Sequence, residues 1–289
     1  MVNIKKIMAA LVVTSIIVGG LVGCSNGAAK KDDSTATSTS SIDAIKKRGT
    51  IKIGVFSDKA PFGYVDSNGK NQGFDVYIAK RFAKDLLGDE SKVEFVLVDA
   101  ASRVAYLESK KVDIIMANFT VTDERAQKVD FTNPYMKVSL GIVSPDSAKI
   151  TSIDQLKGKK VIIAKGTTAE TFLTKNYPDI ELVKYEQYSE IFQALKDGRG
   201  DAIVNDNTEV IAWAKENPGY SVGVASLGGE DTIAPAVAKG DKDLLEWINA
   251  ELETLGKENF VHKAYEATLT PVYGKDYEEN LVIEGGKVK

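Results

Sequence analysis

The chain has 289 residues, with 37 Lys or Arg against 41 Asp or Glu and a formal net charge of −4. No basic cluster stands out, so nucleic acid is not an expected partner. A single His and a single Cys exclude an internal disulfide and leave too few ligands for a zinc site, and we expect neither a metal nor a cofactor.

The N-terminal segment has the pattern of a secretory signal. Lys5 and Lys6 form a basic start, and residues 7–23 form an apolar run interrupted only by a Thr-Ser pair. The run is shorter than the roughly 20 apolar residues that a membrane-spanning helix needs. We therefore expect residues 1–23 to be a signal peptide.

The only cysteine of the chain follows this run directly. The segment Leu21-Val22-Gly23-Cys24 resembles the lipobox of bacterial lipoproteins, whose cysteine becomes the lipid-bearing first residue. The alternative for Cys24 is a free thiol in an uncleaved anchor. Removal of residues 1–23, which hold two lysines and no acid, would leave 35 basic and 41 acidic residues and a net charge of −6.

Residues 24–41 predict a lipidated, flexible tether. They are small and polar and lack apolar periodicity, so they cannot bury enough surface to offset the loss of chain entropy. The folded part is expected to begin near Ile42. It comprises about 245 residues, which suits two lobes or one large domain.

Strands and helices alternate in the first half of this folded part. We predict strands at 50–55, 93–98 and 112–116, with helices at 74–82 and 103–109. Residues 74, 78 and 82 are apolar, which is a helical spacing. The alternation predicts a parallel sheet covered by helices.

The alternation restarts after Pro145. The predicted elements are helices at 153–156, 169–176 and 189–197 and strands at 161–164, 182–185 and 202–204. The last part differs and is predicted as a strand at 233–238 followed by helices at 242–256 and 260–268. The chain thus contains two α/β units of similar plan, without a clear internal repeat.

An ordered set of short motifs spans nearly all of the folded part. They are Gly54-Val55, Ala60–Tyr64, Gly73–Val76, Lys111–Asp113, Ala117–Thr120, Thr122–Arg125, Val129–Phe131, Gly166–Thr168, Gly200–Ala202 and Asp206. In this set and order the chain resembles the amino-acid-binding lipoproteins of ABC importers, which have the type 2 periplasmic-binding-protein fold. Within that family it is most similar to the cysteine-binding branch, which has an end similar to Val282–Lys287.

The resemblance implies an α/β protein of two lobes, each a central sheet flanked by helices. Lobe 1 would comprise residues 42–137 and 233–289, and lobe 2 residues 138–232. Two crossings of the chain, near 137–142 and 229–232, would form a hinge about which the lobes close on a ligand.

The carboxylate of an amino acid ligand is assigned to Arg125 and Thr120. A guanidinium gives a carboxylate two parallel charge-assisted hydrogen bonds, and Thr120 adds a hydroxyl and a backbone amide from one turn. The alternative is an ordinary helix start at Thr122 with a surface arginine, which composition alone favours and the resemblance disfavours.

Two further parts of the chain are expected to contact the ligand, the turn at Thr167 and Thr168 and the side chain of Asp206. Thr167 and Thr168 begin a helix, and the free backbone amides of a helix start form an anion site. The resemblance implies that this turn approaches the ligand carboxylate from lobe 2. The alternative is a simple N-cap. Asp206 follows a strand and is assigned to the ligand ammonium, the alternative being a turn-forming loop aspartate. The backbone carbonyl of Asn118 is expected to face the same ammonium.

The choice of ligand side chain depends on three residues. Phe56 would form an apolar wall that fits a compact thiol or disulfide. Lys59 and Arg103, should they reach the ligand, would instead favour aspartate or glutamate. We favour cysteine or cystine slightly.

Two other functions compete with ligand capture. Enzymes such as dehydratases share the fold, and a fold does not determine a function. The only histidine, His262, has no nucleophile near it in sequence, so we expect no catalysis. A sensory or adhesive surface lipoprotein is the other alternative. The favoured function is a monomeric, extracytoplasmic receptor that is lipid-anchored to the bacterial membrane and delivers its amino acid to an ABC permease and its ATPase.

Overall fold

The structure is a computed structural model that describes residues 40–288. The predicted signal peptide, Cys24 and nearly all of the tether lie outside the described residues. Within residues 40–288, no helix is both long enough and apolar enough to cross a membrane.

The first sheet has five strands in the order β5-β1-β6-β13-β7. Strands β1 (Ile51–Val55), β5 (Val93–Leu97) and β6 (Ile114–Ile115) are parallel to one another. Strand β13 (Ala236–Ala238) runs antiparallel to both β6 and β7 (Val129–Phe131). The three strands predicted to form a parallel sheet are therefore parallel, and β13 makes the complete sheet mixed because the chain returns from the second sheet in the opposite direction.

Helices pack on this sheet through apolar stripes. In α2 (Phe74–Leu87), the apolar residues predicted to share one face, including Phe74 and Phe82, are buried. Helix α8 (Lys242–Gly256) likewise buries its leucines against the same core. The other helices of this part are α1 (Ser41–Arg48), α3 (Arg103–Glu108), α4 (Asp123–Ala126), α9 (Phe260–Thr268), α10 (Thr270–Tyr273) and α11 (Glu278–Leu281), with short 3-10 turns at Glu90–Lys92 and Glu284–Gly286.

The second sheet has the order β10-β9-β11-β8-β12. Strands β9 (Lys160–Ala164), β10 (Glu181–Tyr185) and β11 (Ala202–Asp206) are parallel, whereas β8 (Met136–Pro145) is antiparallel to β11 and to β12 (Tyr220–Ile233). This sheet too is mixed. Its helices are α5 (Thr168–Asn176), α6 (Tyr188–Lys196) and α7 (Asn207–Glu216), with 3-10 turns at Asp146–Ala148 and Ile153–Leu156.

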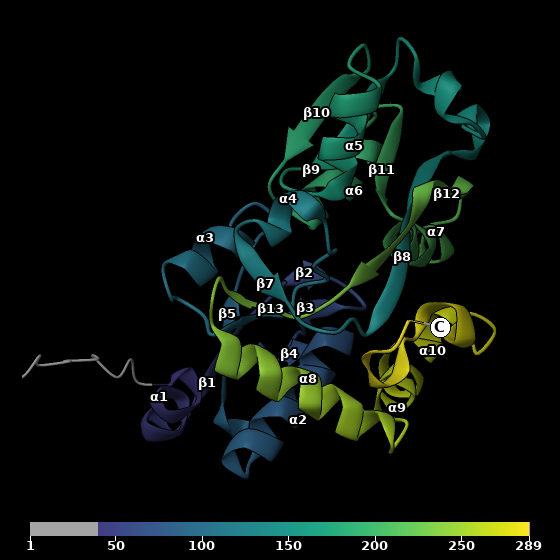
Figure 1. Ribbon diagram of the computed structural model, residues 1–289. Coiled ribbons are helices and arrows are strands. Elements are labelled where there is room, and N and C mark those ends of the chain that lie inside the picture. The colour runs from purple at the N-terminus through teal and green to yellow at the C-terminus, as the bar shows by residue number, and fades with distance from the viewer. Residues whose placement is uncertain (1–39, 289) are drawn as a thin grey trace, which may run out of the picture. The chain divides into compact units, whose positions relative to one another are not determined.

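Strands β8 and β12 carry the chain between the two sheets. Figure 1 shows them as a long pair that rises from the region of β13 and α8 toward β11. Met136 faces Ile233 and Lys137 faces Thr232 in their register, which shifts at three places further along β12. The predicted strand at 233–238 is therefore wrong in its bounds, because Ile233 ends β12 and only residues 236–238 join the first sheet.

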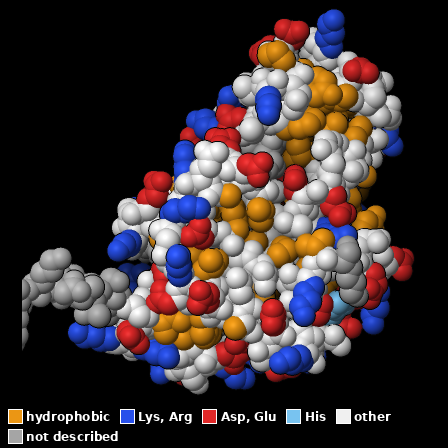
Figure 2. Space-filling view, viewed as in Figure 1, with side chains coloured by type: hydrophobic (Ala, Val, Ile, Leu, Met, Phe, Trp, Pro, Cys, Tyr) orange, Lys and Arg blue, Asp and Glu red, His pale blue; other side chains and the backbone are white. Residues whose placement is uncertain are grey.

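A small three-stranded sheet lies beside these elements. It consists of β2 (Asp58–Lys59), β3 (Gly63–Val65) and β4 (Asn71–Gln72). Close by, one buried apolar cluster combines residues of both large sheets and their helices, among them Phe56 and Tyr188. On the visible surface, acidic and basic side chains are interspersed (Figure 2).

Candidate functional site

Four of the nine predicted binding residues lie at or just after the carboxyl ends of strands of the two large sheets. Phe56 follows β1 directly, Asp206 is the last residue of β11, and Thr167 lies three residues after β9 as the N-cap of α5. Asn118 follows β6 by three residues. In open α/β sheets this edge is where ligands bind, because the loops there meet at a crevice.

The Asn118 turn is held in an unusual backbone conformation. Asn118 has a φ of +43°, a left-handed conformation that few residues other than glycine adopt. Its backbone N–H donates to the carboxylate of Asp75 at 2.8 Å, and Tyr135 donates its hydroxyl to the same carboxylate at 2.6 Å. Asp75 is fully buried, and burial raises its pKa to about 7 despite these two donors. The Asp75–Tyr135 pair thus fixes the turn.

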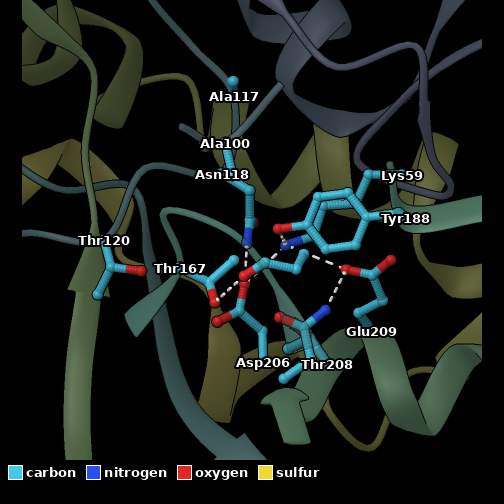
Figure 3. A network of polar contacts seen from close by, with 12 residues as sticks. Lys59, Ala100, Ala117, Asn118, Thr120, Thr167, Tyr188, Asp206, Thr208 and Glu209 are labelled. Atoms are coloured by element: carbon cyan, nitrogen blue, oxygen red, sulfur yellow. Dashed lines mark hydrogen bonds and ion pairs between the residues drawn. The ribbon is translucent and has the colours of Figure 1, made fainter. Parts of the chain in front are cut away.

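Asp206 is the centre of a buried polar network (Figure 3). Its Oδ2 accepts from Lys59 Nζ and from Asn118 Nδ2, each at 2.7 Å. The Lys59 ammonium also lies 3.0 Å from Glu209 Oε2 and donates to the Tyr188 hydroxyl at 3.3 Å. Lys59 is 1% exposed and Asp206 5% exposed, so this is an interior cluster.

The charges of this network compensate one another. Burial alone would lower the pKa of Lys59, but the carboxylates of Asp206 and Glu209 hold it well above its usual range. Burial raises the pKa of Glu209, and the attraction of the Lys59 ammonium opposes this rise. Lys59 therefore stays protonated at neutral pH.

Arg103 is held entirely by backbone carbonyls. Its guanidinium donates to Ala100 O at 3.0 Å, to Ala117 O at 2.9 Å, to Asn118 O at 3.4 Å and to Gly166 O at 3.2 Å. It is 2% exposed and lies over the Phe119 ring, 4.3 Å from its centroid. The Asn118 carbonyl, predicted to face a ligand ammonium, thus has a protein donor.

Arg125 lies on the short helix α4, and its guanidinium makes two hydrogen bonds within residues 40–288. Nη1 donates to Thr120 O at 2.7 Å and Nη2 to Gly166 O at 2.9 Å. Burial and the nearby Arg103 lower its pKa to about 9, while the carboxylate of Asp206 opposes this. Thr120 itself is 3% exposed, and its hydroxyl lies on the side that faces Thr167 and Asp206 in Figure 3.

The Thr167 hydroxyl is occupied by helix capping. It donates to Ala164 O at 2.7 Å and accepts from the backbone N–H of Glu170 at 3.3 Å. The sequence allowed both an N-cap and a ligand contact at Thr167, and the structure shows the N-cap. Thr168, the first residue of α5, lies beside it with the amides of the helix start, which have no acceptor within the helix.

A cleft of about 510 Å³ opens beside this site. Of the predicted binding residues, Arg125 and Thr168 line it, together with Gly166, Phe119 and Asp231. The other seven do not: Phe56, Lys59, Arg103, Asn118, Thr120, Thr167 and Asp206. The Asp206 carboxylate nevertheless acts on the Arg125 guanidinium, because it opposes the lowering of the pKa of Arg125 by burial and by Arg103. Gly166 lines the cleft and accepts hydrogen bonds from both Arg103 and Arg125.

The comparisons with known proteins place the chain in a family. Residues 51–269 match the family model described as bacterial extracellular solute-binding proteins, family 3. The chain belongs to this family. It is 34% identical to the ABC transporter glutamine-binding protein of Bacillus subtilis over 90% of this chain and 96% of that one.

Two solved structures resemble this solute-binding protein more strongly. The solute receptor for L-cysteine of Neisseria gonorrhoeae is 56% identical, with a TM-score of 0.83 over 84% of this chain and 99% of that one. The cysteine-binding protein of Campylobacter jejuni is 54% identical, with a TM-score of 0.84 over 85% and 99%. The predicted two-lobed α/β fold and the likeness to the cysteine-binding branch are confirmed.

The sequence did not point to several residues of the site. Asp75 lies in a quoted motif, but nothing in the pattern indicates that it supports Asn118. Glu209 lies three residues after Asp206 on α7, a helix that was not predicted, and Tyr188 comes from α6. A helical prediction across 207–216 would have placed Glu209 one turn from Asp206 and drawn attention to it.

Among residues 40–288, no group of three or more His, Cys, Asp or Glu is arranged to hold a metal ion. His262 Nδ1 lies 2.7 Å from Glu284 Oε2, in the C-terminal part of the chain. Its contacts are thus with Glu284 and not with the Asp206 network.

Proposed function

We propose that this solute-binding protein captures a polar L-amino acid with a compact side chain and delivers it to an ABC permease and its ATPase. Cysteine or cystine is favoured over aspartate or glutamate. The observation that carries the proposal is that a buried carboxylate, Asp206, acts electrostatically on the guanidinium of Arg125. That guanidinium has N–H donors beyond the two that carbonyl oxygens accept. A zwitterion needs one partner of each kind.

Arg125 suits the ligand carboxylate. A guanidinium has five N–H donors, and in the described part of the chain carbonyl oxygens accept from Arg125 at two places. The remaining donors can form a bidentate pair with a carboxylate. The Thr120 hydroxyl and the N–H groups at Thr167 and Thr168 supply further donors.

Asp206 suits the ligand ammonium. Within residues 40–288, both protein donors to its side chain meet Oδ2, which leaves Oδ1 as an acceptor. The side-chain Oδ1 of Asn118 is buried and has no hydrogen-bond partner in the same region. A buried acceptor without a partner is costly, so Asn118 Oδ1, together with the remaining acceptor of Asp206, favours a ligand that brings several N–H donors.

The side chains of Lys59 and Arg103 disfavour an acidic ligand. The three donors of the Lys59 ammonium are taken by Asp206, Glu209 and Tyr188, and Arg103 makes four contacts to carbonyls. Neither is free to pair with a second ligand carboxylate. Phe56 packs edge-on against Tyr188, 5.1 Å between ring centroids, and offers an apolar wall. The likeness to two cysteine-binding proteins points the same way.

The remaining parts of the proposal concern motion and location. Residues 42–137 with 233–289 and residues 138–232 would move as two lobes about β8 and β12. Cys24 would carry a lipid that anchors a monomeric receptor to the outer side of the cell membrane, after cleavage of residues 1–23. The protein would bind without turnover, as a receptor and not an enzyme.

Mass spectrometry of what the purified protein releases on unfolding tests the proposal. We expect one equivalent of an unmodified amino acid, cysteine or cystine. Release of a peptide, a sugar or a chemically altered product would contradict it. A chain expressed with its N-terminus intact should in addition yield a diacylglyceryl-modified Cys24 peptide, which the variant Cys24→Ser should lack.

A further inference from the structure

Lys59 connects parts of the chain that lie far apart in sequence. It ends the two-residue strand β2, which pairs with β3 through Lys59 and Gly63. Its three polar partners all come from elements of the second sheet: Tyr188 from α6, Asp206 from β11 and Glu209 from α7. A lysine that is 1% exposed is costly to bury, and it is tolerated here because two carboxylates surround it.

The Lys59 ammonium has a single well-defined position. It lies over the ring of Tyr188, 4.4 Å from the centroid, and 5.5 Å from that of Phe56. Glu209, its second carboxylate, is itself held by a hydrogen bond from Asn205 Nδ2 at 3.1 Å. Each donor of the ammonium therefore has a fixed acceptor, and the ammonium cannot turn to another group without leaving a buried charge unpaired.

This position determines how the Asp206 carboxylate is presented. Lys59 and Asn118 both donate to Oδ2, so the two donors together fix the rotation of the carboxylate about its side chain. The other oxygen, Oδ1, is then directed away from both of them. Asn118 is fixed in turn by its backbone bond to Asp75.

We propose that Lys59 is a positioning residue for ligand binding, which acts through Asp206. By occupying Oδ2 it reserves Oδ1 for the ammonium of the ligand, and Glu209 holds Lys59 in place. This inference rests on the proposed function, in which Asp206 binds that ammonium. It assigns Lys59 a role other than direct contact with an acidic ligand side chain, and it adds Glu209 to the residues on which affinity depends.

Two ligands that differ only in the α-ammonium separate this role from a purely structural one. L-cysteine and 3-mercaptopropionate are titrated by calorimetry in reducing buffer, the latter at millimolar concentrations, into the wild type and Lys59→Met. We expect the variant to bind L-cysteine at least about tenfold more weakly, because a misoriented charge-assisted hydrogen bond is lost. Its affinity for 3-mercaptopropionate should change less than about threefold, because that ligand does not use Asp206.

Two further variants complete the experiment. Lys160→Met removes an exposed lysine that lies 3.6 Å from Glu181, and it should change neither affinity. Glu209→Gln should also weaken the binding of L-cysteine more than the binding of 3-mercaptopropionate, but by a smaller factor than Lys59→Met. It also replaces Lys59→Met in the comparison if that variant fails to fold by circular dichroism.

The outcomes distinguish this inference from the proposed function. If Lys59→Met bound both ligands more weakly by the same factor, or bound L-cysteine more tightly, the positioning role would be overturned while the proposed function stands. A wild type that binds neither ligand, and that does not bind cystine in the absence of reductant, would overturn the proposed function itself, and the inference with it.

Discussion

Arg103 and Arg125 donate to the same carbonyl oxygen, that of Gly166, from Nη2 of each at 3.2 Å and 2.9 Å. Gly166 has a φ of +72°, and a Cβ at this position would lie 2.5 Å from the Cα of Ala101, so the close approach requires glycine. Two guanidinium groups therefore meet at one turn. Burial and the repulsion from Arg103 lower the pKa of Arg125, and in the proposed function a ligand carboxylate would offset that repulsion.

The first prediction concerns Arg125. Arg125→Ala should abolish measurable amino acid binding, a loss of at least about a hundredfold, because truncating one partner of a buried charge pair costs about 2–5 kcal/mol. The fold should survive, since Arg125 is only partly buried and makes two bonds to carbonyls. Calorimetry gives the affinity and circular dichroism the fold, with the exposed Arg199→Ala as the control. An unchanged affinity would remove Arg125 from the site.

Asp206 is the subject of the second prediction. Asp206→Ala should likewise abolish binding, and Asp206→Asn should weaken it at least about tenfold, because an amide keeps one acceptor oxygen but loses the charge. In either variant Lys59 keeps Glu209 as its counter-charge, so the protein should still fold. Calorimetry with Asp201→Asn as an exposed control measures the effect. Wild-type affinity in Asp206→Ala would refute the assignment of the ammonium site.

Discrimination between ligands follows from the state of Lys59 and Arg103. Because their donors are already used within the protein, the wild type should bind L-cysteine at least about tenfold more tightly than L-aspartate or L-glutamate. Competition calorimetry of the three amino acids in one buffer makes the comparison. Tighter binding of aspartate would show that Arg103 exchanges its carbonyl partners for a ligand carboxylate.

The stability of the protein should depend on pH through Asp75. Burial raises the pKa of this carboxyl from 3.8 to about 7, so the folded state binds the proton more tightly than the unfolded chain does. The free energy of unfolding should therefore fall as pH rises from about 4 to about 7. The two pKa values correspond to about 4 kcal/mol in total, of which roughly 2.5 kcal/mol falls between pH 5 and pH 8.

The variant Asp75→Asn isolates this contribution. Asparagine keeps an acceptor for the Asn118 N–H but does not titrate, so the fall in stability between pH 5 and pH 8 should be smaller than in the wild type by about 2.5 kcal/mol. Urea unfolding at the two pH values measures it. Parallel pH dependence in both proteins would mean that Asp75 is ionised in the folded state throughout this range.

Regular elements with a strong apolar period could be predicted from the sequence. The bounds of α8 and α9 agree with the prediction, because their leucines and aromatic residues recur at helical spacing. Strand β12 could not be predicted, since most of its residues are exposed or half-buried and three glycines interrupt it. Its strand conformation comes from pairing with β8, a contact between distant parts of the chain.

The candidate site was predictable only in part for a similar reason. Motifs identified Arg125, Asp206 and Asn118, but a lysine in a polar loop such as Lys59 gives no sign that it is buried. Its partners Tyr188 and Asp206 lie 129 and 147 residues further along the chain. Only the folded structure shows that they surround one ammonium group and that Arg103 is occupied by carbonyls.

The central claim is that Arg125 and Asp206 hold the two charged ends of one zwitterion. Calorimetry of the wild type with L-cysteine, with cysteamine, which lacks the carboxylate, and with 3-mercaptopropionate, which lacks the ammonium, tests it most directly. We predict that L-cysteine binds at least about a hundredfold more tightly than either analogue. An analogue that binds as tightly as L-cysteine would contradict the claim.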